Sequence, residues 1–326
     1  MRAAFVVSSL AAICSGAPAQ AAAQPAPPPT QAAVSAEVAY KPDRVVLLDV
    51  TRTGNRLVAV GERGVVMTSD DGGKTWRSQR TRATRTLTGV AFAGDKIGVA
   101  VGHGGTLLRT VDGGDTWTPV EVDAAGRDSL LGVAHLGGST LVAYGAFGLY
   151  LESQDGGVTW TRRKVGGENF DRHISQVIKV GRDLLLVGES GTLARSSDGG
   201  ASWRMMDSPY AGSFFGGLVT AKGTVLIYGM RGNVYRSTDG MKTWSKVDTG
   251  TATSLMGSRL LDDGTIILVG NAGLVGASRD DGASFSFAMD VKTRSLSQVI
   301  GNRAGDLIVV GYPGVQTLDR SLWRAK

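Results

Sequence analysis

The sequence predicts an all-β fold, a seven-bladed β-propeller of four-stranded antiparallel blades with Asp-box turns, and three observations support this prediction. Glycine supplies 47 of 326 residues and proline only 9, so tight turns are frequent but the composition is neither collagen-like nor disordered. One unit of 41 to 43 residues recurs seven times. Each unit holds four β-like runs, which in the second unit are LTGVAFA, KIGVAVG, TLLRTV and TWTPVEV. Four short strands at this period are typical of a propeller blade.

The first 38 residues precede the repeats. Arg2 is followed by an apolar run over residues 3–12, and small-x-small cleavage candidates lie near Ala19 to Ala21, a pattern typical of a secretory signal peptide. We expect residues 1–21 to be a signal peptide, 22–38 an Ala/Pro-rich linker and 39–326 the propeller. A short membrane anchor is the alternative for the first segment. The single cysteine, Cys14, lies there, so the mature chain would contain no disulfide.

A box of the form [ST]-x-D-x-G-x-[ST]-[WF] closes six of the units, with Met241 in place of its glycine in the fifth, and Trp323 ends a decayed seventh copy, TLDRSLW. We expect its aspartates to be structural, because Asx side chains accept hydrogen bonds from backbone amides across a turn. A calcium loop is the alternative, but the copies carry only one or two carboxylates per turn, too few for a hard cation. The box aspartates are Asp71, Asp112, Asp155, Asp198, Asp239 and Asp280.

A second element, G-x-x-G, precedes each box by a fixed distance. In a propeller the turns alternate between two faces, so the boxes should take one face and the G-x-x-G loops, with the links between units, the other. Blade seven ends soon after its decayed box. We predict that residues 37–44 help to complete it from the other end of the chain. The G-x-x-G pairs are Gly61/Gly64, Gly102/Gly105, Gly145/Gly148, Gly188/Gly191, Gly229/Gly232, Gly270/Gly273 and Gly311/Gly314.

Phrases such as VAVGHGGTLLRTVDGGDTW (99–117) and LVGESGTLARSSDGGASW (186–203) make the chain resemble the Asp-box, or BNR, propellers. From residue 45 onward it is similar to the photosystem II stability/assembly factor family. The resemblance implies a non-catalytic periplasmic or lumenal chaperone that binds a membrane-protein partner during assembly. That partner would be photosystem II in a photosynthetic host, and otherwise a transporter or another inner-membrane complex. The expected compartment is the periplasm or the exterior, or the thylakoid lumen if the host is photosynthetic.

A sialidase-like glycoside hydrolase, or a glycan-binding BNR-repeat protein, is the alternative within the same class of propellers. Sialidases carry an Arg-Ile-Pro-type segment before the first blade, whereas this chain has Pro42, Asp43 and Arg44 there. They also usually have six blades. We therefore expect no catalytic residue, no cofactor and no metal.

The predicted partner-binding surface is the face of the G-x-x-G loops and links. Arginines interleaved with aromatic residues suit the recognition of carboxylates or an acidic protein segment. Aligning the units puts Arg85, Arg172 and Arg294 at equivalent positions, where they should ring the central channel. The alternative is that these arginines are merely solvated. The proposed contact residues are Arg63, Arg82, Arg85, Arg127, Arg172, Arg231, Arg294, Phe147, Phe214 and Tyr312.

The formal net charge of +6 is moderately basic, which favours an acidic partner but does not by itself indicate nucleic acid. We expect a membrane-protein complex or its exported segment as the partner, and no nucleic acid. The protein itself should be monomeric and at most peripheral to the membrane.

Overall fold

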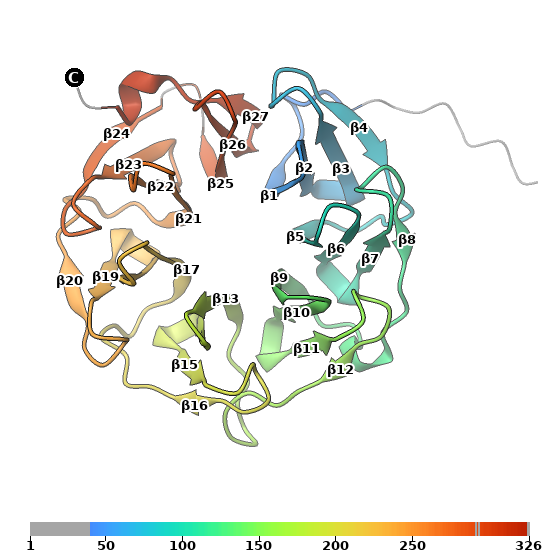
Figure 1. Ribbon diagram of the computed structural model, residues 1–326, viewed down its shortest axis with the longest axis horizontal. Coiled ribbons are helices and arrows are strands. Elements are labelled where there is room, and N and C mark those ends of the chain that lie inside the picture. Colours follow the sequence, from blue (N-terminus) through green and yellow to red (C-terminus); the bar gives the residue numbers. More distant parts are fainter. Residues whose placement is uncertain (1–39, 291, 293, 325–326) are drawn as a thin grey trace, which may run out of the picture. The chain divides into compact units, whose positions relative to one another are not determined.

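A computed structural model describes residues 40–290, 292 and 294–324. The predicted signal peptide and linker lie outside the described residues. Seven antiparallel sheets follow one another around a ring (Figure 1), six of them four-stranded and one, in blade seven, three-stranded among the described residues. The predicted seven-bladed propeller is therefore confirmed. In this part of the chain no helix is long and apolar enough to cross a membrane.

The strands run in chain order from the inside to the outside of each blade. Blades one to four are β1 (Leu47–Thr53), β2 (Arg56–Gly61), β3 (Val65–Ser69) and β4 (Arg77–Arg80); β5 (Leu87–Ala93), β6 (Ile97–Gly102), β7 (Leu107–Thr110) and β8 (Thr118–Pro119); β9 (Leu130–Gly137), β10 (Thr140–Gly145), β11 (Tyr150–Ser153) and β12 (Thr161–Arg162); β13 (Ile174–Val180), β14 (Asp183–Gly188), β15 (Leu193–Ser196) and β16 (Arg204–Met205).

The remaining blades follow the same order. They are β17 (Phe214–Val219), β18 (Val225–Gly229), β19 (Val234–Ser237) and β20 (Ser245–Val247); β21 (Leu255–Leu260), β22 (Ile266–Gly270), β23 (Leu274–Ser278) and β24 (Ser286–Met289); and β25 (Ser295–Gly301), β26 (Leu307–Tyr312) and β27 (Gly314–Thr317). Short 3-10 turns are η1 (Glu62–Gly64), η2 (His103–Gly105), η3 (Asp123–Ala125), η4 (Ala146–Gly148), η5 (Glu189–Gly191), η6 (Met230–Gly232) and η7 (Arg320–Leu322).

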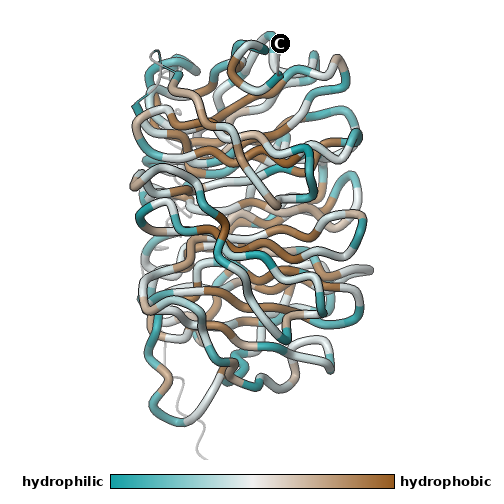
Figure 2. Tube along the Cα trace, turned by 90° about the vertical axis from the view of Figure 1, so that its left-hand side faces the viewer, coloured by the Kyte–Doolittle hydropathy of each residue, from teal (hydrophilic) through white to brown (hydrophobic). Residues whose placement is uncertain are grey.

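The core lies between neighbouring blades. The second strand of each blade is a nearly continuous apolar run that is buried on both sides. One core cluster joins Val58 of blade one to Leu87 and Trp117 of blade two. A buried Val or Leu side chain contributes about 1.5–3 kcal/mol. Figure 2 shows hydrophobic residues along the strands and hydrophilic ones at the turns on both sides.

The box turns are held by hydrogen bonds to their aspartates, as the sequence predicted. In blade four the Asp198 carboxylate accepts from the Ser196 hydroxyl at 2.7 Å and from the Ser202 N–H at 2.9 Å. The Ser202 hydroxyl and N–H lower the pKa of Asp198 to about 2. The other five boxes repeat this pattern at Asp71, Asp112, Asp155, Asp239 and Asp280.

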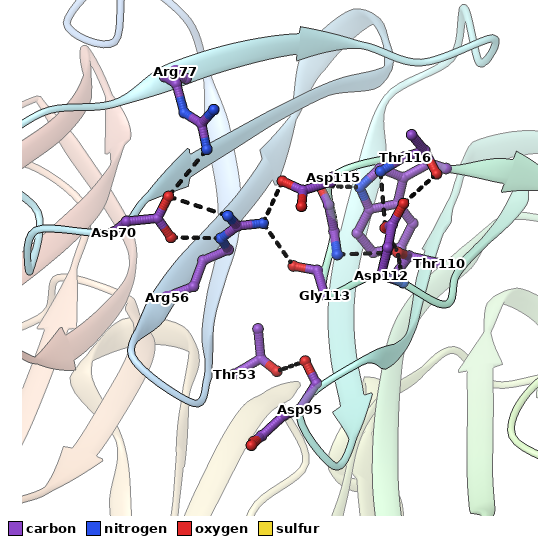
Figure 3. Close-up of polar contacts among 12 residues, drawn as sticks. Thr53, Arg56, Asp70, Arg77, Asp95, Thr110, Asp112, Gly113, Asp115 and Thr116 are labelled. Carbon is purple, nitrogen blue, oxygen red and sulfur yellow. Dashed lines mark hydrogen bonds and ion pairs between the residues drawn. The ribbon is translucent and has the colours of Figure 1, made fainter.

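Arginines fasten one blade to the box of the next. Arg56 in blade one pairs with Asp70 at 2.6 Å, and it also reaches Asp115 at 2.6 Å and the Gly113 carbonyl at 3.2 Å in the box of blade two (Figure 3). The box turn therefore also serves as an attachment point between blades. Arginines of the third strand make similar contacts, from Arg109 to the Gly156 carbonyl and from Arg236 to the Asp281 carbonyl.

The innermost strands leave backbone groups unpaired at their edges, and side chains from the neighbouring blade satisfy several of them. Asp49 on β1 accepts the Val90 N–H of blade two at 2.9 Å, and Gln176 on β13 accepts the Gly217 N–H of blade five at 2.7 Å. Burial raises the pKa of Asp49 to about 7. Polar side chains thus join the inner strands that would otherwise be open edges.

The ring is closed by the segment that precedes β1, and the prediction for residues 37–44 is confirmed in its described part. The Val315 N–H of β27 donates to the Pro42 carbonyl at 2.8 Å. Tyr40 packs against the buried cluster shared by blades one and seven, and its N–H donates to the Ser78 hydroxyl at 3.0 Å. The segment thus occupies, beside the third strand of blade seven, the place that the residues after the outer strand occupy in the other blades.

Replacing Gly314 by alanine tests this closure. Gly314 has a φ of 75°, and an added Cβ would overlap the Pro42 carbonyl oxygen. Gly223 has a φ of 82° with open space around it, so Gly223→Ala is a matched control. We expect the control to lower the free energy of unfolding by about 1 kcal/mol and Gly314→Ala to cost roughly 1–3 kcal/mol more. Urea unfolding measures both, and equal costs would show that Pro42 is not held against blade seven.

The low pKa of Asp198 predicts a pH-dependent contribution to stability. Its folded value lies below its ordinary value of about 3.9, so its stabilisation is complete above about pH 4 and is lost as the pH falls toward 2. We expect Asp198→Asn to lower Tm at neutral pH, with a difference from the parent chain that shrinks between about pH 4 and 2. Asp207→Asn, at an exposed aspartate outside the boxes, is the control. A Tm difference between Asp198→Asn and the parent chain that did not change with pH would contradict the lowered pKa of Asp198.

Candidate functional site: the loop face

The loop face is formed by the G-x-x-G loops and the links between blades. In blades one to six the loop is tied to the start of its own innermost strand, because the first residue after the leading glycine donates its N–H to the carbonyl of the residue before that strand. Examples are His103 to the Thr86 carbonyl at 3.0 Å and Ala146 to the Ser129 carbonyl at 2.9 Å. The boxes instead bond to the first hairpins, as Gly113 does to the Lys96 carbonyl. The predicted division into two faces is therefore confirmed.

The third residue of most G-x-x-G loops is left-handed although it is not glycine. Arg63, Phe147 and Arg231 have φ values of 55°, 52° and 56°, and all three side chains are exposed. A left-handed conformation costs a non-glycine residue roughly 1–2 kcal/mol. Blade two has Gly104 at this position, where an added Cβ would lie 2.9 Å from Arg85 Nε. Most of the loops thus keep a strained backbone conformation at their third residue, and the side chain of that residue is exposed on the loop face.

One cluster on this face joins blades three and four. Phe147 is 57% exposed, and its ring meets His173 edge-on at 5.1 Å. His173 Nδ1 lies 3.4 Å from the Phe147 nitrogen and 3.5 Å from Glu189 Oε2. Serine hydroxyls at 129, 213 and 254 fill the position of His173 in three other blades. The histidine stands out from the serines at this repeat position, a signal that the sequence already contains although His173 is not among the predicted contact residues.

The predicted arginines fall into separate groups around the face. Arg82 and Arg127 line one cavity of about 480 Å³ at the links around blade two, and Arg85 lies beside it over Gly104. Arg294 lies 5.8 Å from the centre of the Tyr312 ring in blade seven, a favourable cation–π arrangement. Tyr312 itself is 44% exposed.

Other predicted arginines stand further apart. Arg172 is exposed in blade four with Asp171 at 3.9 Å. Arg63 and Arg231 occupy the loop tips of blades one and five. Arg85, Arg172 and Arg294 do occupy equivalent places, each two residues before the first buried residue of β5, β13 and β25. Their role in partner binding stays a prediction.

Phe214 corrects the predicted surface. Its side chain is fully buried and packs against Tyr210 and Tyr235 with ring centres about 6 Å apart. Phe214 is the first buried residue of its innermost strand, the position that Leu87 and Leu130 hold in blades two and three. It belongs to the core, and aligning the units would have shown that this position is apolar throughout.

Two acidic residues of the loop face are engaged in the loops themselves. Glu62 accepts the Val46 N–H at 3.1 Å, and Glu189 accepts the His173 N–H at 3.1 Å. The two glutamates occupy the same position in their G-x-x-G loops, which indicates a repeated structural contact. Within the described ranges, no group of three or more His, Cys, Asp or Glu side chains is arranged to hold a metal ion.

Comparison with known proteins identifies similar chains. The family model described as Photosynthesis system II assembly factor YCF48 matches residues 33–140 and 127–275. A solved structure of YCF48 bound to D1 peptide has a TM-score of 0.68 and 19% identity, and covers 83% of this chain and 92% of that one. YCF48 from Cyanidioschyzon merolae has a TM-score of 0.68 and 17% identity, with coverages of 85% and 95%.

The same fold also appears in proteins of other kinds. The WD40 β-propeller domain of Doa1 has a TM-score of 0.68 at 12% identity and covers 86% of this chain and 95% of that one. No curated protein matches the chain. At these identities the solved structures establish the fold alone.

The left-handed loop tips lead to a stability prediction. Arg231→Gly removes an exposed side chain and relieves the strained φ of 56°, so we expect it to raise the free energy of unfolding by up to about 1 kcal/mol. Lys246→Gly, at an exposed position of β20 in the same blade, should instead destabilise, because glycine weakens a strand. Urea unfolding of both variants measures the difference. A loss of stability in Arg231→Gly would mean that the arginine is retained for folding.

Proposed function

We propose that this chain, which belongs to the Photosynthesis system II assembly factor YCF48 family, is a protein-binding scaffold whose loop face captures a segment of a membrane-protein complex during assembly. One observation carries the proposal. In the part of the chain that the structure describes, Arg63, Arg82 and Arg85 have no carboxylate within ion-pair distance, and the same holds for Arg127, Arg231 and Arg294. By contrast, Arg56, Arg163 and Arg236, which lie beside the boxes and outer strands, are paired.

Unpaired arginines determine the chemistry of the partner. A guanidinium presents a rigid fork of donors that matches a carboxylate. The exposed rings of Phe147 and Tyr312 add the apolar anchors that are common at the centres of protein interfaces. We therefore propose an acidic, extended protein segment as the ligand. The structure of YCF48 bound to D1 peptide supports this, because a propeller of this family there holds a peptide.

The cellular setting is part of the proposal. The N-terminal sequence supports export to the periplasm or beyond, or to the thylakoid lumen in a photosynthetic host. Where photosystem II is absent, we propose another inner-membrane complex as the partner. A binding role without catalysis fits the use of Glu62 and Glu189 as ligands of backbone amides. We propose that the protein acts as a monomer, peripheral to the membrane at most.

Charge reversal on the loop face tests the function. The triple variant Arg85→Glu, Arg172→Glu and Arg294→Glu changes three exposed side chains. It should abolish capture of an acidic membrane-protein segment and change stability by no more than about 0.5 kcal/mol per site. A panel of acidic peptides from membrane complexes of the host, immobilised for pull-down, provides the assay.

The matched control reverses the same amount of charge elsewhere. Arg162 and Arg204 on outer strands and Arg182 in a first hairpin are exposed, and their reversal should leave capture intact. Capture that survives the loop-face variant would place the binding surface elsewhere. An equal loss in both triples would indicate that only the net charge of the protein matters. Turnover of a glycoside by the unaltered chain would favour the hydrolase instead.

A further inference from the structure

The opposite face, which carries the boxes and first hairpins, has its own arginine cluster where blades six, seven and one meet. A cavity of about 420 Å³ lies there. Arg52 reaches it from the end of β1, Arg259 from β21, and Arg303 from the turn between β25 and β26. The decayed seventh box forms part of the wall through Trp323 and Arg324. We call this the seam cavity.

The seam cavity holds an excess of positive charge. The pKa of Arg52 is lowered first by burial and then by the charges of Arg259 and Arg303, and only Asp262 acts in the opposite direction. Arg52 also donates to the Gly301 carbonyl, which fixes its head group without neutralising it. Like charges drawn together in a partly buried site repel one another unless an anion binds between them.

The neighbouring carboxylates only partly offset this charge. Asp306 is bound by Arg320 at 2.5 Å and by the Asn302 amide at 3.3 Å. Asp263 accepts the Thr265 N–H at 2.9 Å. The two remaining carboxylates, Asp262 and Asp263, are outnumbered by the four arginines of the lining, so the cavity remains positively charged. These arginines are Arg52, Arg259, Arg303 and Arg324.

Part of the wall of the seam cavity is apolar. Leu260, Leu261 and Trp323 line the cavity beside the guanidinium groups, and Arg324 covers the Trp323 ring at 4.9 Å. An anion with several oxygens matches several guanidinium forks better than a single carboxylate does. The leucines and the tryptophan offer contact to an organic group attached to that anion.

We propose that the seam cavity binds a phosphoryl group carried on a small organic molecule or on a lipid headgroup. The site is separate from the loop face, so it goes beyond the proposed capture of a protein segment. Its residues come from blades at the two ends of the chain, and the cavity is complete only once the ring has closed. A phosphoryl ligand would neutralise Arg52, Arg259 and Arg303 together and stabilise the seam.

The test compares two variants of the full chain. The double variant Arg259→Ser and Arg303→Ser removes two exposed guanidiniums of the cavity, and Arg182→Ser is the control in the equivalent first hairpin of blade four. Calorimetric titration at low ionic strength uses inorganic phosphate and, separately, acetate. Co-sedimentation with vesicles of phosphatidylglycerol or phosphatidylcholine tests the lipid source. Tm confirms that each variant is folded.

We expect the chain to bind phosphate more tightly than acetate, and the double variant to weaken phosphate binding by at least about tenfold, whereas Arg182→Ser changes it by less than about twofold. Co-sedimentation with phosphatidylglycerol that needs the same arginines would identify a lipid headgroup, and its absence would identify a soluble ligand. Equal phosphate affinity in both variants, no phosphate binding, or acetate binding as tight as phosphate would overturn the proposal. Peptide capture by the loop face should be unaffected in the double variant.

Discussion

Apolar packing between neighbouring blades is the interaction on which the rest of the structure depends. Each blade presents two apolar faces, and clusters such as the one joining Val58, Leu87 and Trp117 bury them only if both neighbours are present. Blades one and seven can satisfy this requirement only by meeting each other. Tyr40 and Pro42 support that meeting, because they contact blade seven, which has three strands among the described residues.

The two faces of the ring use their charged residues differently. On the face of the boxes, aspartates organise the turns and arginines such as Arg56 and Arg236 fasten each blade to the next box. The charges of these residues hold the ring together, whereas those of Arg52, Arg259 and Arg303 in the seam cavity are not paired in this way. The loop face is organised by backbone hydrogen bonds and serine hydroxyls instead. Its arginines are therefore available to a partner, and the strained loop tips project them outward.

The fold was predictable from sequence because every unit repeats the same local chemistry. The roles of Asp198 and its equivalents and the closure by the first segment followed from the repeat itself. The places of Phe214 and His173 could also be read from the repeat, because the other units carry apolar residues at the first position and mostly serine or threonine at the second. The cluster of Arg52, Arg259 and Arg303 could not be predicted, because three blades bring together residues that share no repeat position.

The closure by Tyr40 and Pro42 also sets the order in which the molecule can be completed. The segment that seals the ring is synthesised before β1, and the β27 edge that it joins is synthesised after the first six blades. Until the last blade has emerged, the growing chain carries two open apolar faces that no partial product can cover, a state prone to misassembly. The seam, and with it any site built across the seam, is therefore the last part of the propeller to form, and it forms only once all seven blades are present.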